Sequence, residues 1–238
     1  KKTITLIASF MMLIQFSFAQ IQGFSVGQTV SDFTVTDVHG NTHTLSSITN
    51  SGKWVLIDFF FTTCGPCQST VPFFSELHQK YGCNEGDLFC ISIDSGDSDS
   101  EVIAFENQFS ISSGHSPAPA ASGTEGGGDA VVSSFNPAAY PTYCLIGADM
   151  TLKNADIWPV SGINDFESAM SNAGFTPTVM NCTASLNELS LSDANVYPNP
   201  TNGYVNVAIN SINSKSAKIE ISNLLGQIVY TTNSDLEI

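Results

Sequence analysis

The chain contains no arginine, and its seven lysines stand against 22 aspartates and glutamates. The formal net charge at neutral pH is −15. Because phosphate binding depends on clustered lysine and arginine side chains, this shortage argues against nucleic acid and anionic membranes as partners. The chain has 238 residues, 42% of them hydrophobic, which predicts one domain with a substantial core and a smaller second part.

Long hydrophobic runs are also scarce. Near the N-terminus, Lys1-Lys2 precede the apolar segment 6–14, and small residues follow. A membrane-spanning helix needs about 20 apolar residues, whereas Gln15 and Ser17 interrupt this segment. A basic start, a short apolar core and small residues before a cleavage point are typical of a secretory signal peptide. We therefore expect residues 1–20 to be a signal peptide, and no stable membrane span.

The tetrapeptide Cys64-Gly65-Pro66-Cys67 is the motif that points to chemistry. It follows an apolar run at 54–61 that predicts a buried strand, and hydrophobic residues at helical spacing follow it at 67–81. The cysteines are therefore expected at a helix N-terminus, where free backbone N–H groups and the helix dipole stabilise a thiolate. A thiolate is the nucleophile of disulfide exchange, and a second thiol one turn away can resolve the mixed disulfide.

Two other interpretations of this cysteine pair are a zinc site and a purely structural disulfide. Zinc would need a second pair of cysteine or histidine ligands at a matching spacing, which the sequence does not offer. His39 and His43 are better explained as turn and strand-exit residues in water. The acidic stretch 94–101 lacks the full ligand set of a calcium loop, and Ser98 with Glu101 predicts a capping box. We expect no bound metal and no cofactor.

These residues resemble the thioredoxin superfamily, and more narrowly its secreted TlpA-like members, over roughly residues 25–177. The tetrapeptide is the thioredoxin motif itself. Asp58 matches the buried acid that moves protons to and from the second cysteine, and Pro72 matches the proline of the active-site helix. Tyr140-Pro141-Thr142, followed by the strand-like run 143–146, is similar to the cis-proline loop. The resemblance implies an α/β fold, a central mixed sheet flanked by helices.

The resemblance also implies the composition of the site. Its catalytic residues would be Cys64, Cys67, Asp58 and Pro141, and Gly65, Pro66, Thr63, Tyr140 and Pro72 would shape it. Thr63 stands where many members have tryptophan, and the strand-like run 88–93 has no lysine to pair with Asp58. Because Asp58 lies in an apolar strand, desolvation predicts a raised pKa for its carboxyl group.

Export permits structural disulfides among the four other cysteines, which allow three pairings. Cys83 and Cys90 are close in sequence and flank a turn, so we favour this pair, with Cys144–Cys182 as the second. The alternative for Cys90 and Cys144 is a buried free thiol, because both lie in strand-like runs.

The C-terminal part has a different pattern. Beyond a polar linker at 181–190, the turn cluster 197–203 precedes alternating runs typical of short strands. This segment resembles the type A C-terminal sorting domain of type IX secretion, a small all-β sandwich, in an incomplete form. We expect a thioredoxin-like domain at 21–180 and a sorting domain at 191–238. The resemblance implies passage through the periplasm of a Gram-negative bacterium to the surface or the medium, with the type IX secretion machinery as a partner.

The favoured function is a secreted thiol–disulfide oxidoreductase that acts on protein thiols and disulfides, with the direction of electron flow left open. A redox-inert binding or adhesion module on the same scaffold is the first alternative. Thiol peroxidase is the second. Peroxiredoxins carry proline and threonine or serine where this chain has Ile57 and Phe61, and they use an arginine that the chain lacks.

Overall fold

The computed structural model describes residues 21–182, 194–197, 200, 206–209, 216–223 and 228–235. The chain divides into two compact units, Lys1–Thr183 and Ala184–Ile238. The predicted signal peptide and most of the predicted linker lie outside the described residues.

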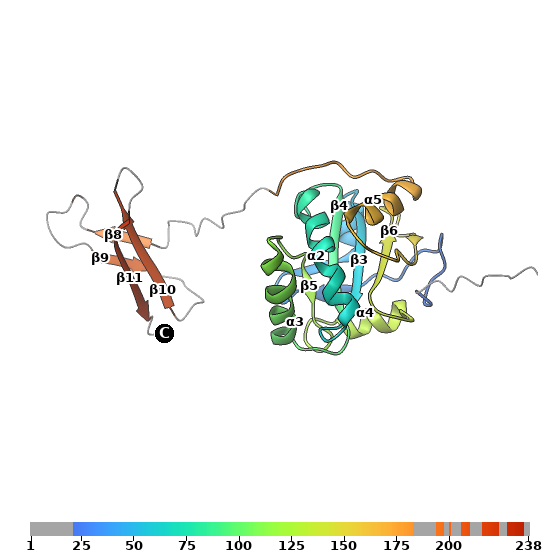
Figure 1. Ribbon diagram of the computed structural model, residues 1–238, viewed down its shortest axis with the longest axis horizontal. Coiled ribbons are helices and arrows are strands. Elements are labelled where there is room, and N and C mark those ends of the chain that lie inside the picture. The colour runs from blue at the N-terminus through green and yellow to red at the C-terminus, as the bar shows by residue number, and fades with distance from the viewer. Residues whose placement is uncertain are drawn as a thin grey trace, which may run out of the picture. The chain divides into compact units, whose positions relative to one another are not determined.

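A five-stranded mixed sheet forms the centre of the first unit, with the strand order β5-β4-β3-β6-β7 (Figure 1). Its strands are β3 (Trp54–Phe60), β4 (Leu88–Asp94), β5 (Ala120–Ala121), β6 (Thr142–Ile146) and β7 (Leu152–Asn154). β3 and β5 both pair in parallel with β4, whereas β6 pairs antiparallel with β3 and β7. After Trp54 every residue of β3 is buried, because helices cover both faces of the strand.

The helices are α1 (Leu45–Asn50), α2 (Gly65–Lys80), α3 (Asp99–Phe105), α4 (Gly128–Phe135) and α5 (Ile163–Asn172). Successive side chains of β3 point to opposite faces of the sheet. Ile57 packs with Phe135 in the core that α1 and α4 cover. Leu56 packs with Phe74 and Phe166 in the core beneath α2 and α5. The predicted arrangement of a mixed sheet flanked by helices is confirmed.

The N-terminal segment forms a hairpin, with β1 (Thr34–Thr36) antiparallel to β2 (Thr42–Thr44). The Asp37 carboxylate stabilises the turn of this hairpin. It accepts hydrogen bonds from the backbone N–H groups of His39 and Asn41 and lies 2.7 Å from Nε2 of His43. His39 lies 3.2 Å from Glu106. Both histidines therefore have carboxylate partners, where the sequence predicted contact with water alone. Helix α1, which follows β2 directly, was not predicted.

One local prediction for the connecting segments, the capping box, is confirmed. Ser98 and Glu101 form a capping box at the start of α3. After α3 the chain continues through the π-helix η1 (Glu106–Ser110) and the 3-10 turn η2 (Ile111–Ser113). The segment between η2 and α4 contains the short strand β5, which adds an edge to the sheet. Gly174 follows α5 with a φ of +82°, a conformation that favours glycine at a helix end.

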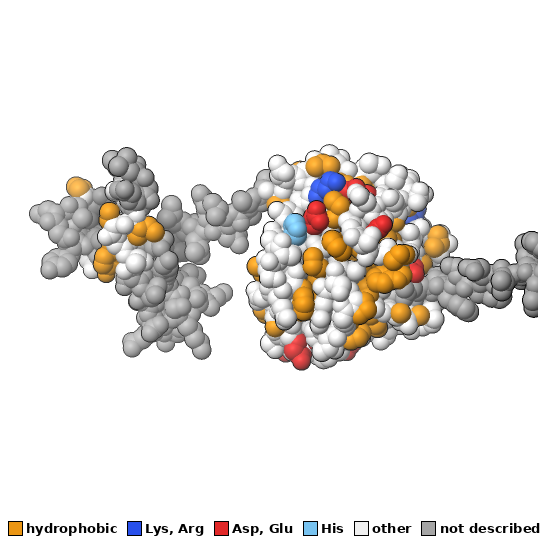
Figure 2. All heavy atoms as spheres, viewed as in Figure 1, with side chains coloured by type: hydrophobic (Ala, Val, Ile, Leu, Met, Phe, Trp, Pro, Cys, Tyr) orange, Lys and Arg blue, Asp and Glu red, His pale blue; other side chains and the backbone are white. Residues whose placement is uncertain are grey.

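Over the face that carries α2 and α5, Figure 2 shows hydrophobic side chains among backbone and other uncoloured groups, with charged side chains sparse. An ion pair joins the two helices, with Nζ of Lys80 2.5 Å from Oε1 of Glu167. The hydroxyl group of Tyr81 donates to the same carboxylate oxygen at 2.9 Å. These contacts fix α5 against the C-terminal end of α2.

The predicted disulfides outside the tetrapeptide are wrong, because Cys83 pairs with Cys182. Cys90 and Cys144 are free and buried. They lie inside β4 and β6 with their side chains in the two hydrophobic cores, out of reach of surface cysteines. Cys83 follows α2 and faces the segment after α5, where the N–H of Met180 donates to the carbonyl oxygen of Lys80. Closeness in sequence was therefore a poor guide to this pairing.

The described residues of the second unit include two antiparallel strand pairs. β8 (Ala194–Tyr197) pairs with β9 (Asn206–Ile209), and β10 (Ser216–Ser222) pairs with β11 (Ile228–Asp235). The alternating runs predicted beyond the turn cluster correspond to β9, β10 and β11. The predicted all-β character of this part is confirmed for the residues described.

Candidate active site

The tetrapeptide lies at the predicted junction between β3 and α2. Cys64 is the N-cap residue of α2, and its Sγ accepts a hydrogen bond from the backbone N–H of Cys67 at 3.1 Å. Pro66 lies in the first turn, where a residue without an N–H is tolerated because that group would have no helical partner. The sulfur of Cys64 thus occupies the place where a helix N-terminus stabilises negative charge.

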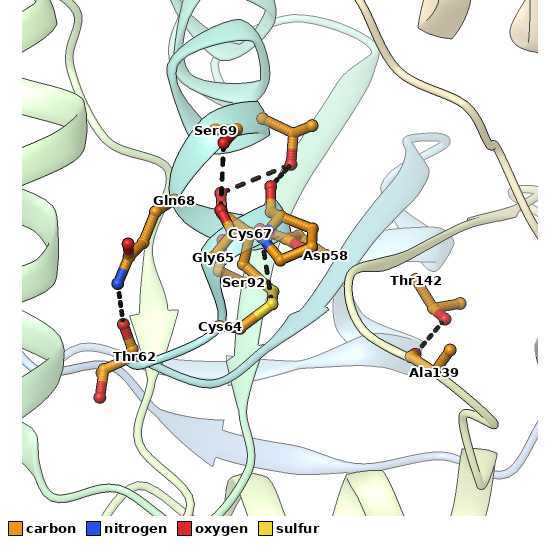
Figure 3. Close-up of a disulfide and its surroundings, with 12 residues drawn as sticks. Asp58, Thr62, Cys64, Gly65, Cys67, Gln68, Ser69, Ser92, Ala139 and Thr142 are labelled. Carbon is orange, nitrogen blue, oxygen red and sulfur yellow. Dashed lines mark hydrogen bonds between the residues drawn. A yellow bond between two sulfur atoms is a disulfide. The ribbon is translucent and has the colours of Figure 1, made fainter.

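Cys64 and Cys67 form a disulfide, with their Cα atoms 5.2 Å apart (Figure 3). Cys64 is 4% exposed and Cys67 is 1% exposed, while Thr63, Gly65 and Pro66 around them are exposed. Both cysteines are therefore largely covered in the oxidised form, and Cys64 is the more accessible of the two.

The backbone before Cys64 is held from two sides. The side-chain amide of Gln68 donates to the carbonyl oxygen of Thr62 at 2.9 Å, as Figure 3 shows. The N–H of Thr62 donates to the carboxylate of Asp97 at 2.6 Å. Further along α2, Pro72 lies inside the helix as predicted, and it removes the N–H that would bond to the carbonyl of Gln68. The approach to the tetrapeptide is therefore well defined.

The loop before β6 meets the tetrapeptide. The peptide bond between Tyr140 and Pro141 is cis, as the resemblance implied. The Tyr140 ring packs edge-on against Phe61 with centroids 5.3 Å apart, and it contacts the hydrophobic cluster that contains Cys64 and Cys67. The structure thus brings together two motifs that lie more than seventy positions apart in the sequence.

Asp58 lies in the middle of β3 and is 2% exposed. Its Oδ2 accepts a long hydrogen bond of 3.4 Å from the hydroxyl of Ser92, and its Oδ1 has no hydrogen-bond partner among the described residues. Desolvation raises the pKa of Asp58 to about 8, and the bond from Ser92 opposes the shift only in part. The predicted rise in pKa is confirmed. A carboxyl group of this kind can accept or release a proton near neutral pH.

Three buried hydroxyl groups of this site were missed by the sequence analysis. Asp58 is in register with Ser92 on β4 and with Tyr143 on β6. The hydroxyl of Tyr143 donates to Thr70 on α2 at 2.9 Å. A polar side chain in each of the apolar strands β4 and β6, on the same face as Asp58, is the signal that could have found Ser92 and Tyr143. Thr70 lies on α2, where no strand pattern indicates it.

An open groove runs beside the tetrapeptide. Thr62, Thr63 and Gln68 line one side of it, and Ala104, Phe105 and Phe109 line the other. Within the described residues, no group of three or more histidine, cysteine, aspartate or glutamate side chains could hold a metal ion. The same part of the chain holds no helix with the length and apolar character that a membrane crossing requires.

Two family models match the chain. Residues 26–155 match the model of the AhpC/TSA family, and residues 195–237 match the model of the secretion system C-terminal sorting domain. The first match covers the hairpin, the tetrapeptide, Asp58 and the Tyr140–Pro141 loop. The second covers all four described strands of the C-terminal unit, apart from the first residue of β8.

Curated relatives match part of the chain. The chain is 32% identical over 99 residues to the thiol-disulfide oxidoreductase ResA of Bacillus thuringiensis (strain Al Hakam), covering 42% of this chain and 55% of the relative. It is 28% identical over 137 residues to a ResA of Bacillus cereus, covering 58% and 72%. A thioredoxin of Coprinus comatus is 38% identical over 64 residues, covering 27% and 60%. The chain thus spans about half the length of the first of these relatives.

Solved structures show the fold. The thioredoxin domain of a thiol-disulfide oxidoreductase from Bacteroides vulgatus matches with a TM-score of 0.50 at 15% identity, covering 63% of this chain and 97% of that one. A thiol:disulfide interchange protein of the thioredoxin family from Chlorobium tepidum TLS matches with a TM-score of 0.50 at 19% identity, covering 61% and 95%. The N-terminal unit therefore has a thioredoxin-like fold.

Proposed function

Since the chain belongs to the AhpC/TSA family, we propose that it is an exported thiol–disulfide oxidoreductase that exchanges disulfides with partner proteins through Cys64 and Cys67. The observation that carries the proposal is the disulfide at the N-terminus of α2, with Cys64 as the N-cap residue and the buried Asp58 in the adjoining strand. A structural disulfide has no need of a helix N-terminus or of a buried acid with a raised pKa.

The reaction has two steps. In the reduced protein the Cys64 thiolate attacks one sulfur of a partner disulfide, forms a mixed disulfide and releases one partner thiolate. Cys67 then loses its proton, attacks Sγ of Cys64 and releases the second partner thiolate. Two electrons pass from the dithiol to the partner, and the reverse sequence oxidises a partner dithiol. The direction depends on the potentials of the two pairs.

Each further residue of the site has a role in this scheme. Asp58 takes the proton of Cys67, because its pKa of about 8 places the carboxyl near the working pH. Pro141 and Tyr140 form the wall against which the partner backbone docks. Gly65, Pro66 and Thr63 are the exposed surroundings of the sulfur atoms. The groove beside Thr63 offers room for an extended polypeptide.

Export is the second part of the proposal. The match of residues 195–237 to a secretion system sorting domain supports recognition of this unit by the type IX machinery. Residues 1–20 act as the signal peptide for the first step into the periplasm, and 181–190 link the thioredoxin-like domain at 21–180 to the sorting domain at 191–238.

The decisive experiment separates the two cysteines. We expect Cys64→Ser to abolish the reduction of insulin disulfides, because no nucleophile reaches the partner. We expect Cys67→Ser to retain the first step and to accumulate covalent complexes with partner proteins, visible on non-reducing gels. Cys90→Ala, which removes a buried thiol outside the site, should exchange disulfides like the wild type. A chain in which Cys67→Ser traps nothing and the wild type leaves insulin intact is a redox-inert binding module.

A further inference from the structure

A chain of buried hydroxyl groups connects the sheet to the backbone of the tetrapeptide. Tyr143 on β6 is fully buried, and Thr70 on α2 is 3% exposed. The Tyr143 hydroxyl donates to Oγ1 of Thr70 at 2.9 Å, and Thr70 donates to the carbonyl oxygen of Pro66 at 3.0 Å. The same Oγ1 lies 3.4 Å from the carbonyl oxygen of Cys67. Each of the two hydroxyl groups therefore donates its proton in a hydrogen bond, and this series of bonds ends at the backbone of the turn that contains Pro66 and Cys67.

Packing alone does not require these hydroxyl groups. The Tyr143 ring already fills its site, with ring centroids 5.5 Å from Phe74 and 4.9 Å from Phe166. Phenylalanine and valine would occupy the volumes of Tyr143 and Thr70 without burying any hydroxyl group. Burying a hydroxyl group costs free energy unless it is hydrogen-bonded. The pair therefore serves a purpose other than filling the core.

A neighbouring residue shows what is particular to Thr70. Ser69 also donates from its side chain to a carbonyl four residues back, that of Gly65 at 3.1 Å. This kind of bond is common for serine and threonine in helices. Ser69 is exposed, however, whereas Thr70 also accepts a bond from another element of the fold. Thr70 therefore anchors the turn to the sheet, and Ser69 does not.

The anchor matters most when the disulfide is open. Cys64 and Cys67 then lose their covalent link, and Cys67 must be returned to Sγ of Cys64 in the mixed disulfide. Tyr143 is in register with Asp58 on the neighbouring strand. The hydrogen bonds through Thr70 therefore also fix the position of the Pro66–Cys67 turn relative to the Asp58 carboxyl group, which accepts the proton of Cys67. A displacement of about 1 Å from the reactive geometry can cost on the order of 10²-fold in rate.

We propose that Thr70 and Tyr143 are positioning residues for the second step of exchange: their hydrogen bonds hold the Pro66–Cys67 turn to β6, so that Cys67 stays aligned with Cys64 and Asp58 after the disulfide opens. The proposal rests on the proposed function and adds residues to the same site. It assigns them to resolution of the mixed disulfide and gives them no part in the first attack by Cys64.

An aromatic disulfide, 5,5′-dithiobis(2-nitrobenzoate), separates the two steps. The full chain is first treated with dithiothreitol until peptide mapping finds Cys64 and Cys67 reduced and the Cys83–Cys182 bond intact. Attack by Cys64 on the reagent releases one thionitrobenzoate and leaves the other on Cys64. Attack by Cys67 on Cys64 then releases the second thionitrobenzoate and closes the protein disulfide. Absorbance records the two releases as two phases.

We expect Thr70→Val to slow the second phase about tenfold or more and to change the first phase less than about twofold, because only the Cys67 turn is released. Thr70→Ser keeps the hydroxyl group and should recover most of the second-phase rate. Ser69→Ala, the matched control, removes the exposed bond one position earlier and should leave both phases as in the wild type. Tyr143→Phe keeps the ring and the bond from Thr70 to Pro66, so it should slow the second phase less than Thr70→Val.

Several outcomes would overturn the proposal. The positioning role is wrong if Thr70→Val leaves the rate of the second phase unchanged or slows both phases equally. It is also wrong if Thr70→Ser slows the second phase as much as Thr70→Val does. If Thr70→Val does not fold, Tyr143→Phe decides, and an unchanged second phase then rejects the positioning role. A wild-type chain with no first phase rejects the proposed function instead, so the two failures are distinguishable.

Discussion

Asp58 is the residue whose ionisation we expect to govern the pH dependence of exchange. It is buried in β3, and its carboxylate accepts only a long hydrogen bond from Ser92 among the residues that the structure describes. Desolvation places its pKa at about 8. The carboxylate, which can accept the proton of Cys67, therefore forms as the pH rises toward 8, and exchange should accelerate over the same interval.

Asp58→Asn should remove this inflection and slow exchange on the order of 10²-fold, the usual contribution of one general base. The measurement is the rate of insulin reduction from about pH 6 to about pH 10. Ser92→Ala is the companion variant. It removes the bond that favours the carboxylate, so the inflection should move to higher pH while exchange persists. A rate–pH profile of Asp58→Asn that overlays the wild-type profile removes Asp58 from the mechanism.

At the scale of secondary-structure elements, helix α2 has a different role at each end. Its N-terminus carries the reactive disulfide, and its C-terminal end is tied to the segment after α5. The Cys83–Cys182 bond closes a loop with a sequence separation of 99. Hydrogen bonds from Thr178 to Asp87 and from Met180 to Lys80 support the same contact. This second disulfide therefore stabilises the end of the helix that is remote from the chemistry.

Cys182→Ser should lower the free energy of unfolding by about 2–4 kcal/mol, the usual effect of losing a disulfide that closes a long loop. Urea unfolding under non-reducing conditions measures it. Asn181→Ser, an exposed neighbour, is the matched control and should unfold like the wild type. Exchange activity below the unfolding transition should persist in Cys182→Ser, because Cys64 and Cys67 lie at the opposite end of α2. Equal stabilities of Cys182→Ser and the wild type would contradict a stabilising role for this bond.

For the molecule as a whole, three buried carboxyl groups set the response of stability to pH. Desolvation raises the pKa of Asp58 to about 8 and those of Asp94 and Glu106 to about 7. The folded protein holds these protons over a range in which the unfolded chain has lost them. Their contribution to stability is therefore complete below the ordinary pKa of about 4 and is lost as the pH rises toward 8.

One buried base acts in the opposite direction, because desolvation lowers the pKa of His78 to about 4 and its contribution is lost as the pH falls below its ordinary value. The loss of stability from the three carboxyl groups as the pH rises is larger than the gain from the one imidazole. We therefore expect the urea midpoint to be higher near pH 5.5 than near pH 8, roughly the window between these pKa values. Asp94→Asn removes one of the three groups and should flatten the dependence. A midpoint that rises steadily from the acidic to the basic condition would refute this explanation.

The sequence by itself determined the local parts of the site. The apolar run before Cys64 and the helical pattern after it place the cysteines at a strand-to-helix junction, because each element is specified by its own side-chain periodicity. Ser98 and Glu101 cap α3 through contacts three residues apart. The raised pKa of Asp58 follows from its apolar neighbours within the same strand. None of these inferences depends on knowing where distant segments lie.

The tertiary structure alone decided which distant groups meet. The Cys83–Cys182 bond depends on the path of the segment after α5, and the sequence favoured Cys90 because it is nearby. The bond between Tyr143 and Thr70 depends on the register of β3 with β6 and on the seating of α2 over that face. Side-chain periodicity shows which residues are buried but not which partner each finds, because register and packing between elements are properties of the assembled core.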